Sequence, residues 1–325
     1  MARVLSGVQP TGAPHIGNYL GAWSRWARDQ QPGHFFCVVD LHAMTVPYEP
    51  AQLRARTADV ATWLLACGLD PDVATVFVQS HVREHSELAW ILNCVATMGE
   101  LQRMTQFKEK SEGRESVTAG LFTYPVLQAA DILLYQAEEV PIGDDQRQHL
   151  ELCRDVAQRF NHHFGETFTV PVATFPKTGA RVMDLQNDDK KMSKSLPPTG
   201  TILLSDDEPT TRKKIKRAVT DSGAEVRAAP DKRGVTNLLD LMAAVTGKDV
   251  ADLEAHFVGK GYGDFKAELA EAVNGVLRPV RDRYAELCDD RPAVEEALVK
   301  GADRAREVAA TTMVAVRERV GFFKP

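Results

Sequence analysis

The sequence lacks the features that mark unusual classes of protein. Its five cysteines are odd in number and form no CxxC pair, so a disulfide framework and a structural zinc site are both disfavoured. No uninterrupted apolar run reaches the length of a membrane span, and residues 1–8 contain no signal-peptide core. The net charge of −6 argues against sequence-blind coating of DNA or RNA. We expect a cytoplasmic protein that binds neither membranes nor DNA.

The chain otherwise has the composition of a globular protein, with 44% hydrophobic and 26% charged residues. Its 325 residues predict one large domain and a smaller one. Apolar runs typical of buried strands alternate with segments of helical periodicity up to about residue 198, and only helical patterns follow. We therefore predict an α/β fold: a Rossmann-like doubly wound parallel sheet over 1–198 and a mostly helical domain over 199–325, with the last helix as a candidate to pack back on the sheet.

The predicted strands and helices are short segments separated by polar turns. We predict strands at 3–7, 35–40, 74–78, 140–142 and 182–185, and helices after residue 18 and at 51–67, 87–98, 124–135, 148–164, 249–257, 264–288 and 292–320. Sheets of this kind bind ligands at the carboxyl ends of their strands.

A turn with glycine and proline, at 9–18, follows the first predicted strand and leads into a helix. The free N–H groups and positive dipole end at such a helix start form an anion site. Gly12 and Gly17 would let a phosphate approach the backbone, and His15 adds a donor. An ordinary βα turn has the same form, so the segment gains a function only if a second element completes it.

The second element is Lys-Lys-Met-Ser-Lys-Ser at 190–195. Lysines three apart beside two serines suit a loop that closes on polyphosphate, although a solvated turn is the usual interpretation of such a hexamer. Here segment 14–18, Pro-His-Ile-Gly-Asn, resembles the HIGH element of class I aminoacyl-tRNA synthetases, and 191–195 reads KMSKS letter for letter. The pair, in this order, is a specific signal for that family.

The resemblance implies that ATP is a substrate and that Mg²⁺ is held mainly through the ATP phosphates. It implies catalytic roles for His15, Lys191 and Lys194, and for Lys110 in the segment Met-Thr-Gln-Phe-Lys-Glu-Lys at 104–110. Residues 143–146 resemble the GxDQ element of these enzymes, although Asp144 would also serve as an ordinary helix cap. The residues implied at ATP are Gln9, Pro10, Thr11, Gly17, Asn18, Gly143, Asp144, Asp145, Val182, Lys191, Met192, Ser193, Lys194 and Ser195.

An almost wholly apolar helix at 124–135 carries three polar side chains on one face, Tyr124, Gln128 and Asp131. Pro125 fits the first turn of this helix. A buried carboxylate needs a donor, so Asp131 either braces a neighbouring element or accepts a hydrogen bond from a ligand. Its two polar neighbours on the same face favour the ligand.

The helix resembles the specificity helix of bacterial tryptophanyl-tRNA synthetases, a resemblance that spans nearly the whole chain and is densest over 3–195. In that family the residue matching Asp131 accepts the indole N–H of tryptophan, and phenylalanine would leave this acid unpaired. The residues implied at tryptophan are Leu5, Gln9, His42, Tyr124, Gln128, Asp131 and Gln146, although His42 could equally be an ordinary loop histidine. The implied activity is tryptophan–tRNA ligation, with L-tryptophan, ATP and tRNA(Trp) as partners and a homodimer as the assembly.

Two positions depart from the family and keep alternatives open. Leu5 stands where an aromatic residue is usual, and Gln128 replaces the usual methionine. With Gln128 the helix reads as in the tyrosine-specific relatives, so a tyrosine-specific or tryptophan-analogue-specific synthetase is the nearest alternative. A non-catalytic synthetase-like sensor and an adenylyltransferase of the wider HIGH-containing superfamily are further ones.

The helical half contains five cations within residues 212–217. A solvated helix face and contact with tRNA phosphates are equally good interpretations of this run. In the family the helical domain receives the anticodon, but no residue here identifies itself as a reader of bases.

Overall fold

The computed structural model describes residues 2–113, 115–175, 182–193 and 196–323. Within these residues it contains a five-stranded sheet in the order β3-β2-β1-β4-β5, and every pairing is parallel. The strands are β1 (Val4–Val8), β2 (His34–Val38), β3 (Thr75–Val78), β4 (Glu139–Pro141) and β5 (Val172–Thr174). The predicted doubly wound sheet is confirmed. The strand order reverses at β1, so the crevice between the ends of β1 and β4 is where such a sheet binds ligands.

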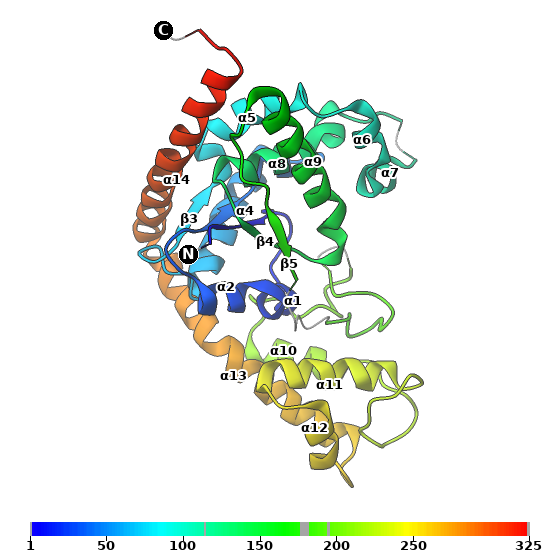
Figure 1. Ribbon diagram of the computed structural model, residues 1–325. Coiled ribbons are helices and arrows are strands. Elements are labelled where there is room, and N and C mark those ends of the chain that lie inside the picture. Colours follow the sequence, from blue (N-terminus) through cyan, green and yellow to red (C-terminus); the bar gives the residue numbers. More distant parts are fainter. Residues whose placement is uncertain (1, 114, 176–181, 194–195, 324–325) are drawn as a thin grey trace.

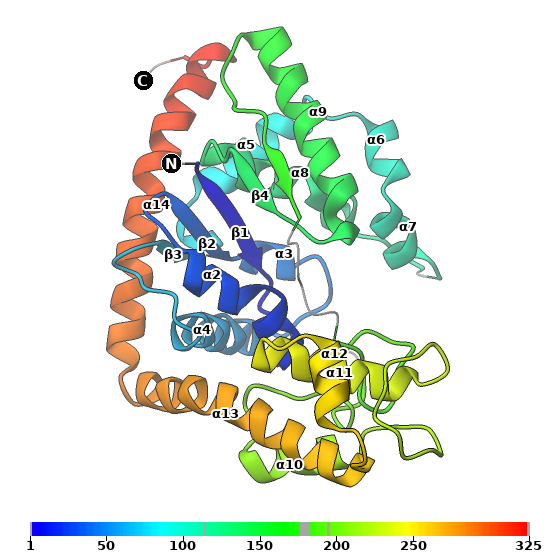
Figure 2. The ribbon, with the colours of Figure 1, turned by 60° about the horizontal axis from the view of Figure 1, so that its bottom comes forward.

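Helices cover both faces of the sheet (Figures 1 and 2). They are α1 (Ile16–Asn18), the π turn η1 (Tyr19–Trp23), α2 (Ser24–Asp29), α3 (Asp40–Ala43), α4 (Pro50–Ala66), the 3₁₀ turn η2 (Gln79–His81), α5 (Glu84–Asn93), α6 (Met98–Arg103), α7 (Thr105–Ser111), α8 (Ala119–Leu134), the 3₁₀ turn η3 (Asp144–Gln146), α9 (Arg147–Phe164), α10 (Glu208–Lys216), α11 (Arg233–Thr246), α12 (Val250–His256), α13 (Tyr262–Asp289) and α14 (Arg291–Arg319). None of those described is both long and apolar enough to cross a membrane.

Strand β2 is almost wholly apolar because its successive side chains enter two different cores. Phe36 and Val38 of β2 pack in one buried cluster with side chains of α4 and α13. Phe35 and Cys37 pack in a second cluster with α5, α8 and α9 on the opposite face. Alternate residues of a strand point to opposite faces, so a sheet covered on both faces needs apolar residues at every position.

Four details of the predicted elements are wrong. Thr118 caps α8, accepting from the N–H of Leu121, so the helix starts earlier than predicted and Pro125 lies in its interior. The helix predicted at 87–98 is α5, followed by a separate α6 that a capping box at Thr97 begins. The segment 182–185 forms only a single antiparallel bridge, between Met183 and Lys191. The fifth strand of the sheet is instead β5, at the exposed edge, which apolar periodicity did not reveal.

The helical half is joined to the sheet by α13 and α14. Figures 1 and 2 show α10, α11 and α12 grouped at one end of the molecule, with α13 leading away from them and α14 running along the side of the sheet. Tyr284 of α13 stacks on Trp63 of α4, with ring centroids 3.7 Å apart and planes 9° from parallel. The boundary between residues 198 and 199 stays a prediction.

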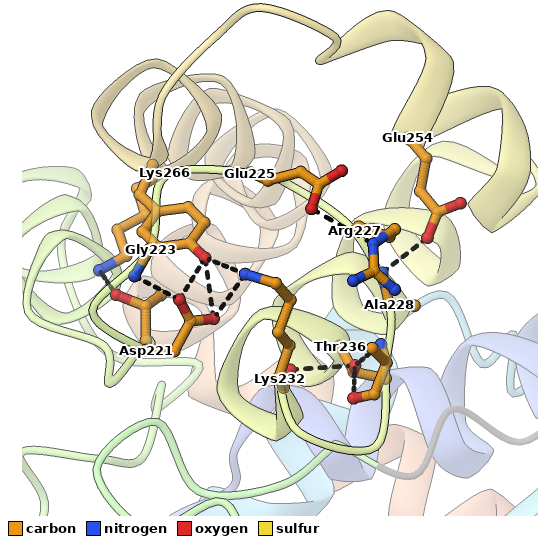
Figure 3. Close-up of polar contacts among 12 residues, drawn as sticks. Asp221, Gly223, Glu225, Arg227, Ala228, Lys232, Thr236, Glu254 and Lys266 are labelled. Atoms are coloured by element: carbon orange, nitrogen blue, oxygen red, sulfur yellow. Dashed lines mark hydrogen bonds and ion pairs between the residues drawn. The ribbon is translucent and has the colours of Figure 1, made fainter.

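The segment between α10 and α11 is fixed by a polar cluster rather than by secondary structure (Figure 3). Asp221 accepts from Lys232 at 3.0 Å, from the Tyr262 hydroxyl at 2.8 Å and from the N–H of Gly223 at 2.6 Å. Glu254 accepts from the N–H of Ala228 at 2.6 Å. These contacts tie the segment to α11, α12 and α13.

Close packing of α14 on β3 depends on one glycine. A Cβ atom at Gly301 would lie 1.8 Å from the carbonyl oxygen of Val76, so any side chain there must push the helix away from the strand. We expect Gly301→Ala to lower the free energy of unfolding by about 1–3 kcal/mol, the usual cost of overpacking. Urea denaturation followed by circular dichroism measures this change.

Gly275→Ala is the matched control, because Gly275 lies within α13 with no atom near its Cβ position. Alanine is the better helix former, so this variant should gain up to about 1 kcal/mol. Equal effects of the two substitutions would contradict the packing argument.

Candidate active site

A cavity of about 370 Å³ opens at the carboxyl ends of β1 and β4. It is lined by Leu5, Ser6, Gly7, Gln9, Cys37, Val39, His42, Gln106, Lys110, Tyr124, Gln128, Asp131, Ile132, Val140, Pro141, Ile142, Gly143 and Gln146. Apolar and polar residues line it in about equal number. A cavity that combines apolar walls with converging polar groups is typical of a site for a small molecule, and this one lies where the strand order reverses.

Asp131 is the buried charge of this cavity, and it is already held by three side chains. Its Oδ1 accepts from Gln79 Nε2 at 2.6 Å and lies 2.7 Å from His85 Nδ1, while Oδ2 lies 2.7 Å from His42 Nε2. His85 in turn contacts the Tyr135 hydroxyl at 2.8 Å through Nε2. All these side chains are buried.

These contacts keep the carboxylate ionised. Burial by itself would raise the Asp131 pKa, but the charge and hydrogen bonds of His42 and His85 outweigh burial and hold that pKa well below its usual range. A carboxylate left without donors in such a place would instead become protonated.

The fold brings two of the three donors to Asp131 by a common rule. His42 lies on α3, directly after β2, and Gln79 begins η2, directly after β3. The carboxyl ends of neighbouring parallel strands meet at one edge of a sheet, so both side chains arrive beside α8. His85 comes from α5, which packs on the same face.

This network corrects one inference from the sequence. We expected phenylalanine to leave Asp131 unpaired, yet the chain itself already gives the acid three partners. A substrate that lacks a donor therefore makes one hydrogen bond fewer, but it does not leave the carboxylate without donors. Rejection of phenylalanine by four to five orders of magnitude does not follow from Asp131 alone.

Tyr124 belongs to a second polar group beside the cavity. Its hydroxyl lies 3.1 Å from Gln106 Oε1 and 2.8 Å from His149 Nε2. Lys110 donates to the same Gln106 oxygen at 3.1 Å, and its Nζ lies 4.9 Å from the centroid of the Tyr124 ring. Lys110, Tyr124 and the Gln106 amide thus line the cavity together.

The hydrogen-bond pattern fixes the proton positions in this group. Among the described residues, His149 Nδ1 is buried without a hydrogen-bond partner. A bare nitrogen lone pair costs less there than an unsatisfied N–H, so Nε2 of His149 carries the proton and donates to Tyr124. The single proton of Tyr124 then goes to Gln106, which accepts it.

Gln128 points toward the cavity and toward the turn that follows β4. Its Nε2 lies 3.4 Å from Gln146 Oε1, and Gln146 Nε2 donates to Asp145 Oδ2 at 2.8 Å. Gln106 Nε2 donates to the carbonyl of Asp145 at 3.3 Å. The two residues that differ from the usual family pattern, Leu5 and Gln128, therefore both line the cavity.

The turn with His15 is fastened to a distant segment of the chain. The N–H of Ile16 donates to the carbonyl of Ile202, and the N–H of Leu204 donates to the carbonyl of Pro14, both at 2.9 Å. The helix that follows is only three residues long and passes into a π turn. The free N–H groups expected at this helix start are therefore fewer than predicted, because that of Ile16 is taken.

Two positions of this turn are occupied by glycine for different structural reasons. Gly12 has φ of +61°, a conformation that favours glycine. A Cβ at Gly17 would lie 3.0 Å from the His15 imidazole, so this glycine makes room for the histidine. From the sequence we predicted instead that both glycines let a phosphate approach the backbone.

The lysine segment leads directly to the residues that hold the His15 turn. Lys191 forms the bridge with Met183, and buried Met192 donates its N–H to the carbonyl of Val182 at 3.0 Å. The N–H of Leu185 donates to the carbonyl of Gly200 at 2.8 Å. Lys194 and Ser195 lie outside the described residues.

The structure gathers the residues predicted at tryptophan more completely than those predicted at ATP. The cavity is lined by Leu5, Gln9, His42, Lys110, Tyr124, Gln128, Asp131, Gly143 and Gln146. The predicted residues outside its lining are Pro10, Thr11, His15, Gly17, Asn18, Asp145, Val182, Lys191, Met192 and Ser193. Asp144 lies in η3, and its side chain is outside the described part of the chain.

Sequence reasoning missed Gln79, His85, Gln106 and His149. Gln79 had a usable signal, because a polar residue directly after a buried strand lies at the ligand edge of a parallel sheet. His85 and His149 are single histidines within helices, where a satisfied core residue is the usual outcome, so spacing alone could not select them.

The basic run at 212–217 is divided between two environments. Lys214 turns inward, where Nζ donates to the carbonyl of Thr201 at 2.9 Å and to Asp206 at 2.6 Å. Arg212 pairs with Glu271. Lys213, Lys216 and Arg217 are exposed. The interpretation of this run as a solvated helix face is therefore wrong for Lys214.

His149 should make the folding stability depend on pH. Burial and the nearby Lys110 lower the pKa of His149 from 6.5 to about 4, and burial raises the pKa of Tyr124 to about 12. The unfolded chain therefore takes up a proton at His149 before the folded chain does, and this residue should cost stability as the pH falls from 6.5 toward 4. Urea unfolding between pH 7 and 4.5 measures the loss.

His149→Gln is the matched control, since its amide can still donate to Tyr124 but does not titrate. The difference in unfolding free energy between the wild type and this variant should change across that pH range. A constant difference would mean that His149 has an ordinary pKa.

Comparison with known proteins agrees with this arrangement. The chain is 53% identical to a tryptophan–tRNA ligase 2 of Streptomyces avermitilis, covering 98% of this chain and 97% of that one. It is 52% identical to a tryptophan–tRNA ligase of Caldanaerobacter subterraneus subsp. tengcongensis, with 99% and 98% covered.

Solved structures match over the same extent. A tryptophanyl-tRNA synthetase from Mycoplasma pneumoniae is 38% identical and superimposes with a TM-score of 0.89, covering 99% of this chain and 98% of that one. One from Campylobacter jejuni, complexed with ADP and tryptophan, is 36% identical with a TM-score of 0.85, covering 98% and 100%. A family model described as class I tRNA synthetases (W and Y) matches residues 1–278. The chain belongs to this class I tRNA synthetase family.

Proposed function

We propose that this chain is a tryptophan–tRNA ligase. It activates L-tryptophan with ATP to tryptophanyl-adenylate and transfers the amino acid to tRNA(Trp), releasing AMP and pyrophosphate. The observation that carries the choice of substrate is the ionised Asp131, which lines the cavity together with apolar residues such as Ile132 and Val140. Relatives that match over nearly the whole chain are named for the same amino acid.

The geometry of Asp131 leaves room for one ligand donor. An ionised carboxylate offers about four acceptor positions. Gln79 and His85 occupy Oδ1, and His42 occupies one position at Oδ2. The remaining position at Oδ2 is proposed to accept the indole N–H, while Ile132, Val140 and the other apolar walls bury the ring.

The polar group around Tyr124 is proposed to hold the other end of tryptophan. The Tyr124 oxygen and the Gln146 amide line the cavity together with Gln9 and can meet the ammonium group. Burial keeps the Tyr124 pKa near 12, so its hydroxyl stays neutral at physiological pH. Lys110 also lines the cavity. It is proposed to attract either the carboxylate of tryptophan or the ATP phosphate that this carboxylate attacks.

ATP is proposed to enter as MgATP, with Mg²⁺ as part of the nucleotide substrate. Gly143, Asp144 and Asp145 are proposed to hold the adenosine, and His15, Lys191 and Lys194 the phosphates. The carboxylate oxygen of tryptophan attacks the α-phosphorus in line, and the bond to the β-phosphate oxygen breaks as pyrophosphate leaves. Such a step needs positioning and charge stabilisation more than covalent help from the protein.

The tRNA acceptor end then supplies a ribose hydroxyl that attacks the activated carboxyl, and AMP leaves. The exposed cations Lys213, Lys216 and Arg217 are proposed to contact tRNA phosphates, whereas Lys214 is occupied inside the fold. We place this reaction in the cytosol.

A substrate panel tests the proposed function. Purified protein should catalyse ATP–pyrophosphate exchange with tryptophan and charge tRNA(Trp), and tyrosine should be a poor substrate. Benzothienylalanine, in which sulfur replaces the indole N–H, should be activated about 10- to 150-fold less efficiently, the worth of one hydrogen bond to a charged group. Preference for tyrosine, or binding of tryptophan without exchange, would overturn the assignment.

Asp131→Asn is the matched variant for this panel. It should lower kcat/KM for tryptophan by at least about 100-fold, because the amide disturbs three donors as well as the ligand bond. The advantage of tryptophan over benzothienylalanine should shrink in the same variant.

A homodimer is proposed as the assembly, with a second copy covering an apolar surface near α5 and the end of α9. Trp90 is 70% exposed there and lines a hollow of about 310 Å³ with Cys94, Phe164 and Phe322. Large apolar side chains gathered on one surface mark an interaction site more often than scattered ones do.

Light scattering after size-exclusion chromatography tests this assembly. Trp90→Glu should shift the wild-type mass from dimer to monomer, because the charge would be buried in the interface. Val258→Glu is the control: Val258 is 81% exposed and lies at the end of α12, away from this surface. A monomeric wild type would contradict the proposal.

A further inference from the structure

Residues 201–204, here called the strip, connect the lysine segment to the His15 turn. The carbonyl of Ile202 accepts the N–H of Ile16, and the N–H of Leu204 donates to the carbonyl of Pro14, each at 2.9 Å. Thr201, Ile202 and Leu204 of the strip are buried, and Leu203 is half-buried. Through these two bonds, the position of the strip sets the position of the backbone that carries His15.

The opposite edge of the strip is bound by cations of the helical half. Lys214 of α10 donates to the carbonyl of Thr201 at 2.9 Å. Arg281 of α13 donates through Nε to the carbonyl of Leu204 at 3.1 Å. The strip therefore lies between the His15 turn on one side and two helices on the other, with its backbone bonded in both directions.

Arg281 is itself held rigidly. Its Nη1 donates to Asn274 Oδ1 at 3.0 Å and its Nη2 to Thr211 Oγ1 at 2.9 Å. Asn274 and Thr211 are fully buried, and Asn274 also donates to the carbonyl of Glu208 at 3.3 Å. A planar guanidinium with three fixed acceptors defines both the position and the direction of the bond to Leu204.

We propose that Arg281 is a positioning residue for the adenylation step: from the helical half it sets, through the strip, where the His15 turn stands relative to the lysine segment. This proposal rests on the proposed function, which brings the ATP phosphates to that junction. Arg281 is not proposed to touch either substrate, and its described hydrogen bonds go to Leu204, Asn274 and Thr211.

The proposal predicts a selective defect. Loss of the guanidinium leaves the carbonyl of Leu204 without this donor, and the strip can shift. A displacement of about 1 Å far from the chemistry can lower the rate about 100-fold. The tryptophan cavity is lined by residues of the first half and by none of the strip, so the affinity for tryptophan should be retained.

The experiment compares arginines three residues apart on α13. Arg281→Met removes the three donors at similar length, and Arg281→Lys restores one cationic donor. Arg278→Met is the matched control, since exposed Arg278 pairs only with Glu208 at 2.6 Å among the described residues. For each variant, ATP–pyrophosphate exchange gives kcat and KM for ATP, calorimetry gives the Kd for tryptophan, and thermal unfolding shows the temperature range in which the chain is folded.

We expect Arg281→Met to lower kcat/KM for ATP about 10- to 100-fold at a temperature where it is folded, with the tryptophan Kd unchanged within about twofold. Arg281→Lys should recover part of the loss, and Arg278→Met should behave as the wild type. Normal ATP kinetics in Arg281→Met, or a parallel fall of tryptophan binding and ATP kinetics with stability, would overturn the proposal. A wild type without exchange activity would instead overturn the proposed function.

Discussion

A buried negative charge with three donors organises the site. Placing an isolated carboxylate in a protein interior costs far more than one hydrogen bond returns, so the charge persists only where several groups converge on it. Asp131 meets that condition through Gln79, His85 and His42, each from a different element. The acid therefore stays ionised only if the ends of β2 and β3 and the helices α5 and α8 keep their relative positions. Those same positions determine the shape of the cavity.

The network also limits what Asp131 can do for selectivity. An acid that is largely satisfied without a ligand stays in one orientation and adds one well-directed bond to an incoming donor. Its contribution is then the worth of one charge-assisted hydrogen bond, about 1.5–3 kcal/mol, rather than the cost of an orphaned charge. Discrimination beyond that must come from the apolar walls and from Gln128, whose amide faces the same space.

The sequence was enough to predict the sheet and to select Asp131, but not to predict all the partners of this acid. Apolar runs were enough to predict the parallel sheet, and an acid within an apolar helix was enough to select Asp131. His42 could be placed at the cavity because it follows a strand, whereas Gln79 and His85 could not be paired with an acid 52 and 46 residues away, since a contact at that separation depends on tertiary packing.

Local rules also competed where the sequence predictions failed. Pro125 suits a first helical turn, but the cap at Thr118 starts the helix earlier, and tertiary packing tolerates the proline inside α8. Lys214 belongs to a basic run typical of a solvated face, yet the carbonyl of Thr201 and the carboxylate of Asp206 draw it inward. In both cases one specific partner outweighed a compositional tendency.

The two sides of the site differ in which parts of the chain build them. Among the described residues, those that line the cavity around Asp131 all lie within 5–146, in the sheet and the helices that cover it. The His15 turn, by contrast, takes two of its backbone bonds from residues 202 and 204, and those residues are held by α10 and α13. The shape of the cavity proposed for the amino acid is therefore set by local packing, whereas the position of the turn proposed to hold the ATP phosphates depends on contacts across both halves of the chain. Under the proposed function, the helical half binds RNA and the other half activates the amino acid; under the proposal for Arg281, contacts made on the helical half act on the step that uses ATP while the cavity around Asp131 keeps its shape.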